Sequence, residues 1–206
     1  MVVLVADKNI EFALRGILAR PKAVGMRSVF ADIFIHPERD AGCFSRGEQF
    51  LRSFSSQYDR GLLVLDRDGS GRDDQSRETL ETELESRLAG AGWADRARAI
   101  VIEPELEIWV WAESPHVEDV LGWKGRKPDL RRWLKVAGFV DVEAAKPGRP
   151  KSAMQEALRI VSKPRSSVLY SRLAERVSYA RCTDPAFDKL RSILGAWFPP
   201  AAIASE

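Results

Sequence analysis

The stretch Gly61-Leu62-Leu63-Val64-Leu65-Asp66-Arg67-Asp68-Gly69 joins an apolar run to two carboxylates and a glycine. A short, wholly apolar run that ends in polar residues predicts a strand buried on both faces. Comparable runs occupy residues 2–6, 27–35 and 98–102, and helical periodicity fills 9–20, 45–58 and 76–89 between them. Alternating strands and helices predict an α/β fold with a mostly parallel, four-stranded sheet flanked by helices.

Beyond residue 103 the sequence predicts helices only. The expected helical segments are 104–113, 128–138, 151–163, 166–180 and 185–197. We therefore divide the chain into an α/β core, residues 1–113, and a helical, basic C-terminal part, residues 114–206, packed on that core. Hydrophobic residues make up 45% and charged residues 30% of the chain, a balance that argues against disorder.

The net charge of +2 conceals an uneven distribution. Residues 1–123 hold 15 Lys and Arg against 22 Asp and Glu, residues 124–181 hold 15 against 5, and residues 182–206 hold 2 against 3, so −7, +10 and −1 sum to +2. An acidic segment beside a basic one is typical of a metal site next to a surface that binds a polyanion. No apolar run approaches the length of a membrane span, and two cysteines provide no disulfide framework. We expect a cytoplasmic protein with no membrane partner.

Carboxylates follow three of the expected strands. Asp66 and Asp68 lie two residues apart on an extended chain, so their side chains can point the same way. Because ligands bind beyond the carboxyl ends of parallel strands, Asp66 and Asp68 are candidate ligands for Mg²⁺ or Mn²⁺. Asp7 and Glu11, after the first strand, are candidates for a further ligand or a general acid or base. Glu105 and Glu107, after the fourth strand, complete the candidate metal set.

Several other interpretations fit the Asp66–Asp68 motif. It could be an acidic surface turn. It resembles the start of an EF-hand loop, but Arg77 occupies the position of the required glutamate. It also resembles the first motif of haloacid dehalogenase phosphatases, in which Asp66 would be the nucleophile and Asp68 the acid or base. The later lysine and acidic pair of those enzymes have no convincing match here.

The order of these motifs resembles that of TOPRIM domains, the metal-binding modules of primases, topoisomerases and some phage-defence nucleases. It is more closely similar to a family of small TOPRIM-like bacterial defence proteins, the domain of unknown function numbered 4276. The matching stretches are residues 2–18, 61–69, 100–111 and 169–187. The resemblance implies a TOPRIM/Rossmann-like fold and a role in a multi-gene anti-phage system, of which a system that includes a methyltransferase is one candidate. The family has Val-Glu-Gly-x-x-Glu after strand one, whereas this chain has Val5-Ala6-Asp7-Lys8-Asn9-Ile10-Glu11. Either Asp7 or Glu11 substitutes for the missing first glutamate, or the chain keeps binding without catalysis.

Basic residues of the C-terminal part are candidates for holding a nucleic-acid backbone, and Trp123 and Trp133 lie among them, either to stack on bases or to pack in the core. The candidate residues are Lys124, Arg126, Lys127, Arg131, Arg132 and Lys151. We expect metal-dependent hydrolysis of nucleic-acid phosphodiesters within a defence system, with other proteins of the same locus as partners. The alternatives are a non-catalytic subunit that binds nucleic acid or protein, and the phosphatase.

Overall fold

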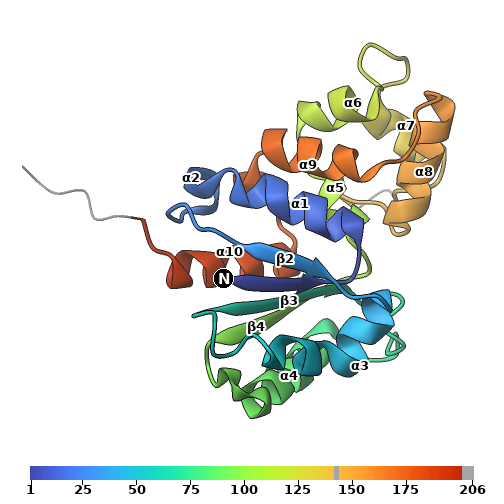
Figure 1. The fold of residues 1–206 in the computed structure, drawn as a ribbon. Helices are drawn as coiled ribbons and strands as arrows, with labels where there is room; N and C mark the ends of the chain where they lie inside the picture. Colours follow the sequence, from blue (N-terminus) through green and yellow to red (C-terminus); the bar gives the residue numbers. More distant parts are fainter. Residues whose placement is uncertain (142–143, 201–206) are drawn as a thin grey trace, which may run out of the picture.

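A sheet of four parallel strands, in the order β2-β1-β3-β4, forms the centre of the computed structural model, which describes residues 1–141 and 144–200. The strands are β1 (Val2–Val5), β2 (Asp32–Ile35), β3 (Gly61–Asp66) and β4 (Ala97–Ile102). In β1, β3 and β4 nearly every residue is buried, as their apolar composition predicted. The expected α/β fold with a parallel sheet and a helical C-terminal part is therefore confirmed (Figure 1).

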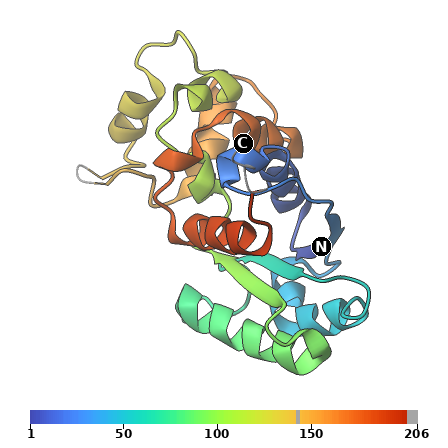
Figure 2. The same ribbon diagram turned by 90° about the vertical axis from the view of Figure 1, so that its left-hand side faces the viewer.

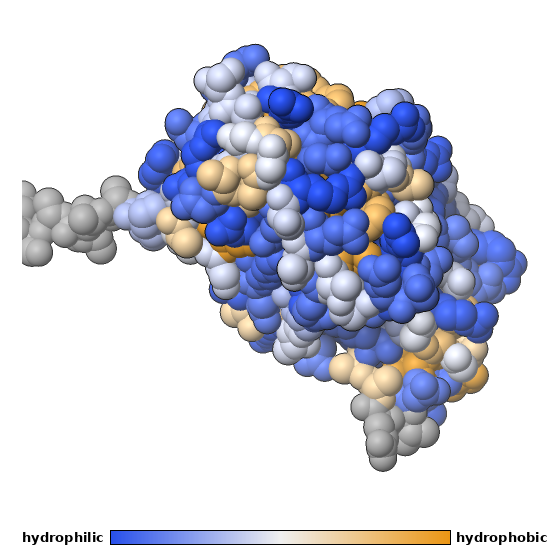
Figure 3. Space-filling model, turned by 90° about the horizontal axis from the view of Figure 1, so that it is seen from below, coloured by the Kyte–Doolittle hydropathy of each residue, from blue (hydrophilic) through white to orange (hydrophobic). Residues whose placement is uncertain are grey.

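Helices cover both faces of the sheet. Helices α3 (Arg39–Arg52) and α4 (Arg77–Leu88), with the π-helical turn η1 (Ala89–Trp93), pack on one face, and α1 (Lys8–Leu18) packs on the other. Helix α10 (Pro185–Trp197), from the end of the chain, lies against β4 (Figure 2). The outer surface of α3 and α4 is mostly hydrophilic, with small hydrophobic patches (Figure 3). Among the described residues, no helix combines the length and apolar character that crossing a bilayer requires.

The remaining helices are short, and most belong to the C-terminal part. Helix α9 packs along α1. Gly16 permits this close approach because it has no Cβ, which would lie only 2.8 Å from the Cβ of Ala174. The C-terminal part therefore completes the cover of the sheet and packs on the core. The bounds of these elements are α2 (Pro21–Val24), α5 (Glu107–Val110), α6 (Pro115–Leu121), α7 (Leu130–Val136), α8 (Pro150–Ile160), α9 (Ser167–Arg176) and the 3₁₀ turn η2 (Tyr179–Arg181).

Several predicted boundaries were wrong, for identifiable reasons. The strand expected over 27–35 begins only at Asp32, because its partner β1 begins opposite it at Val2. The helix expected over 45–58 is α3, which starts at Arg39 and ends at Arg52. Phe54, after it, packs on Phe34 of β2 and on Phe50 of α3. The helix expected over 104–113 is reduced to α5. The one expected over 166–180 ends at Arg176, where Val177 adopts extended backbone angles.

Candidate site at the carboxyl edge of the sheet

The topology brings the ends of β1 and β3 together at the carboxyl edge of the sheet. Strands β1 and β3 pair directly, with Val5 opposite Val64. The chain leaves β1 for α1 on one face and leaves β3 for α4 on the other, so the two connections diverge (Figure 1). A parallel sheet binds ligands at such a divergence, and Asp7 and Asp66 both lie there.

Asp66 lies within electrostatic range of four other carboxylates. Burial raises the pKa of Asp66 well above its ordinary value, and the charges of Asp40, Glu107, Asp7 and Glu105 raise it further. Asp7, Glu105 and Glu107 were predicted from the sequence, whereas Asp40, which comes from the first turn of α3, was not. Asp40 accepts a hydrogen bond from the backbone N–H of Asp66 (2.8 Å), which ties α3 to the end of β3.

The acids at this edge already have partners within the protein. Asp7 caps α1 by accepting hydrogen bonds from the backbone N–H groups of Asn9 and Ile10, at 2.8 and 2.9 Å. Asp66 accepts one from the N–H of Leu106 (2.9 Å). Helix N-termini and loop N–H groups stabilise carboxylates without a metal. The local structure therefore explains the position of both side chains.

Two basic side chains of the C-terminal part neutralise the glutamates. The ammonium of Lys151, at the start of α8, donates to Glu105 (2.9 Å), whose other oxygen accepts the N–H of Lys151 (3.0 Å). Arg165, just before α9, pairs with Glu107, which also accepts a hydrogen bond from the Tyr170 hydroxyl. Glu107 is 1% exposed and Glu105 8%, so each charge needs such a partner.

The side chains of two predicted site residues take no part in these hydrogen bonds and ion pairs. Asp68 faces solvent with half of its side chain exposed, and its nearest cation is Arg67 at 3.7 Å. Burial and the charges of Glu105 and Asp73 raise the pKa of Asp68, while Arg67 opposes them. Glu11 pairs with Arg15 one turn along α1 (2.7 Å) and is not among the main charges acting on Asp66. Asp66 is likewise not among the main charges that shift the pKa of Asp68, and Asp68 is not among those that shift the pKa of Asp66.

The donor set suits a hard cation chemically, since it consists of carboxylate oxygens. Its arrangement does not: within residues 1–141 and 144–200, no three His, Cys, Asp or Glu side chains are grouped so as to hold a metal ion. The positions that a cation would take beside Glu105 and Glu107 are filled by Lys151 and Arg165. The protein thus supplies the counter-charge itself.

A basic hollow of about 490 Å³ lies beside these acids, over the ends of β1 and β2. Four of its lining side chains are basic and one is acidic. Burial lowers the pKa of His36 despite the opposing charge of Glu38, which favours the neutral imidazole there. The lining residues are Asp7, Lys8, Asn9, Ile35, His36, Pro37, Arg39, Lys151 and Arg165.

The predicted nucleic-acid-binding residues are divided between two places. Lys151 lines the hollow. Lys124, Arg126 and Lys127 are exposed in the connection between α6 and α7, and Arg132 is exposed on α7. Arg131 instead donates to the backbone carbonyls of Ala112 and Ala145.

The aromatic residues among these positions serve packing. Trp123 is 2% exposed, which leaves no face for a base. It packs on Trp133 with ring centroids 4.7 Å apart, and Trp133 also packs on Phe139. Of the two interpretations left open by the sequence, core packing therefore describes Trp123.

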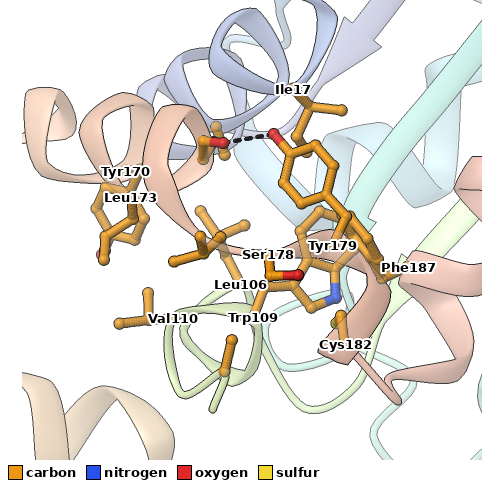
Figure 4. A pocket seen from close by; sticks show the side chains of 14 residues that line it. Ile17, Leu106, Trp109, Val110, Tyr170, Leu173, Ser178, Tyr179, Cys182 and Phe187 are labelled. Atoms are coloured by element: carbon orange, nitrogen blue, oxygen red, sulfur yellow. Dashed lines mark hydrogen bonds between the residues drawn. The ribbon is translucent and has the colours of Figure 1, made fainter. Parts of the chain in front are cut away.

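A small apolar cavity of about 40 Å³ lies between α1, α5, α9 and α10 (Figure 4). Ile17, Leu106, Trp109 and Phe187 line it together with Cys182, and the Tyr179 hydroxyl at its margin donates to the carbonyl of Ala174. Burial raises the pKa of the Cys182 thiol, which disfavours the nucleophilic thiolate. The cavity is therefore part of the core packing.

Comparison with protein-family models, with curated proteins and with solved structures finds no match to this chain. The resemblance to TOPRIM-like defence proteins stays a prediction from the motifs.

Arg165→Met tests the internal counter-charge. Removing the guanidinium leaves Glu107 buried and charged, so we expect the free energy of unfolding to fall by about 3 kcal/mol in urea denaturation. Adding Glu107→Gln should restore most of this loss. Arg159→Met is the matched control, because Arg159 is mostly exposed beside Glu156 and should cost under about 0.5 kcal/mol. Equal effects of the two single variants would contradict this account.

Asp66→Asn tests the crowding of carboxylates. A raised pKa in the folded state means that stability falls as pH rises from the unfolded pKa, near 3.8, through the folded one. The asparagine can still accept the Leu106 N–H but carries no charge. We expect Asp66→Asn to raise Tm at pH 7.5, with the gain disappearing below about pH 3.8. A lower Tm at pH 7.5, with no change at the exposed control Asp73→Asn, would refute it.

Proposed function

We propose that the chain binds the phosphate backbone of a nucleic acid at the hollow over the ends of β1 and β2. One observation carries the proposal: Lys8, Arg39, Lys151 and Arg165 converge on this hollow, whose lining contains a single acid, Asp7. Phosphate contacts from Lys and Arg supply most of the affinity in nucleic-acid binding. The carboxyl edge of a parallel sheet is also where such folds place their ligands.

Binding without catalysis fits the state of the acids. Asp7, Asp66, Glu105 and Glu107 all have hydrogen-bond or ion-pair partners within the protein, and Lys151 and Arg165 hold the two glutamates. The motif after β1 points the same way, since Ala6 follows Val5 where TOPRIM-like chains carry the first glutamate, and only Asp7 or Glu11 is left to substitute for it. Partners from a defence locus, which the resemblance implies, remain part of the proposal.

Metal-dependent hydrolysis of phosphodiesters by Mg²⁺ or Mn²⁺ is the second candidate function. Its supporting observation is the crowding around Asp66, since a divalent cation would relieve the repulsion from Asp40, Asp7, Glu105 and Glu107. Because the described carboxylates are not grouped around a cation position, we derive no catalytic step from them. The phosphatase alternative has no additional support.

Fluorescence anisotropy with a labelled single-stranded oligonucleotide, in EDTA, tests the proposed binding. Lys8→Glu places a negative charge at the rim of the hollow, so we expect affinity to fall at least about tenfold, with a shallower salt dependence. Arg132→Glu makes the same charge change on α7 and should have a much smaller effect. If Arg132→Glu weakens oligonucleotide binding more than Lys8→Glu does, the binding surface lies on the α6–α7 side. If the wild type does not bind the oligonucleotide, the proposal is refuted.

Incubation of the same oligonucleotide with Mn²⁺ separates the two candidate functions. The proposed binding function predicts no cleavage by wild type. Cleavage that requires Mn²⁺, stops with EDTA and is abolished by Asp66→Asn would establish the second candidate in its place.

A further inference from the structure

Arg39 combines backbone strain with a side chain that the fold does not use. Its φ is +52°, in the left-handed region that favours glycine. Its side chain is exposed and has no ion-pair or hydrogen-bond partner among the residues that the structure describes. The fold therefore bears the cost of this conformation with no compensating contact of the guanidinium.

The surrounding turn holds Arg39 in this conformation. The carbonyl of His36 accepts the N–H of Arg39 (3.1 Å), and Nδ1 of His36 accepts the N–H of Glu38 (3.1 Å). Gly42 packs so closely that a Cβ there would lie 2.2 Å from this imidazole nitrogen. On the other side, Asp40 is hydrogen-bonded to the end of β3. The strained residue is thus fixed between two anchored neighbours, as strained residues at functional sites are.

The position of Arg39 gives the strain a chemical purpose. Arg39 lines the hollow together with Lys8, Lys151 and Arg165. Lys151 and Arg165 are already paired with Glu105 and Glu107. The guanidinium of Arg39 makes no hydrogen bond or ion pair with any described residue, so its donors are available to a ligand. A guanidinium presents parallel N–H groups that match two oxygens of a phosphate.

We propose that the hollow is an oxyanion site in which Arg39 holds one phosphate group of the bound ligand, and that the strained backbone at Arg39 is kept to aim the guanidinium there. The inference rests on the proposed backbone-binding function and names the residue that grips the phosphate. Lys8 adds a second positive charge at the rim. Lys151 and Arg165 contribute charge while holding the acids beneath.

Two substitutions at Arg39 separate the ligand contact from the strain. Arg39→Ala removes the guanidinium and keeps the Cβ, while Arg39→Gly removes both. We expect both variants to bind inorganic phosphate at least about tenfold more weakly than wild type in isothermal titration. In phosphate-free buffer, the glycine variant should unfold at a Tm about 2–4 °C above the alanine variant, because glycine tolerates a positive φ. Arg52→Ala, at an exposed arginine on the same helix, is the control and should bind phosphate as wild type does.

The outcomes distinguish this inference from the proposed function. Unchanged phosphate binding by Arg39→Ala and Arg39→Gly, or absence of phosphate binding by wild type, overturns the inference. If the wild type still binds the oligonucleotide in those cases, backbone binding stands without this phosphate site. If it binds neither, both proposals fail. A glycine variant no more stable than the alanine variant overturns the claim that strain is retained for aiming the side chain.

Discussion

Buried carboxylates at one edge of a sheet require counter-charge, and in this protein that charge comes from distant parts of the same chain. Glu105 and Glu107 follow β4, whereas their partners Lys151 and Arg165 belong to the helical C-terminal part. An unpaired buried charge costs several kcal/mol, so the core and the helical part depend on each other at this edge. The acidic and basic segments of the sequence are therefore complementary within one molecule.

The same contacts shape the proposed ligand-binding surface. Once Lys151 and Arg165 neutralise the glutamates, the hollow beside them has an excess of positive charge from Lys8 and Arg39. Hydrogen bonds from Asn9, Ile10 and Leu106 hold Asp7 and Asp66 in place. The carboxylates at this edge are paired within the protein and lie beneath the proposed anion site.

Much of the fold could be predicted from local sequence. The apolar runs identified all four strands, and the acids after three of them could be read directly from the chain. Parallel pairing of β1 with β3 then places Asp7 and Asp66 at one edge. Asp40 escaped prediction because the start of α3 was expected six residues later, at Ser45. Without that helix start, nothing in the sequence indicates that Asp40 reaches the end of β3.

The charge balance of the site could not be predicted, because it depends on long-range packing. Lys151 and Glu105 are 46 residues apart, and Arg165 and Glu107 are 58 apart. The basic segment looked like a single surface, yet Arg131 serves the backbone and Lys151 serves the acidic edge. The positive φ of Arg39 has no sequence signal at all, since arginine is not a residue that favours it.

The decisive measurement is a crystal structure of the chain with a short single-stranded oligonucleotide and Mn²⁺. We expect a phosphate of the oligonucleotide to contact Arg39, while Lys151 and Arg165 stay paired with Glu105 and Glu107 and no Mn²⁺ binds at Asp66. Mn²⁺ coordinated by Asp66 and either glutamate, with Lys151 and Arg165 displaced, would contradict it.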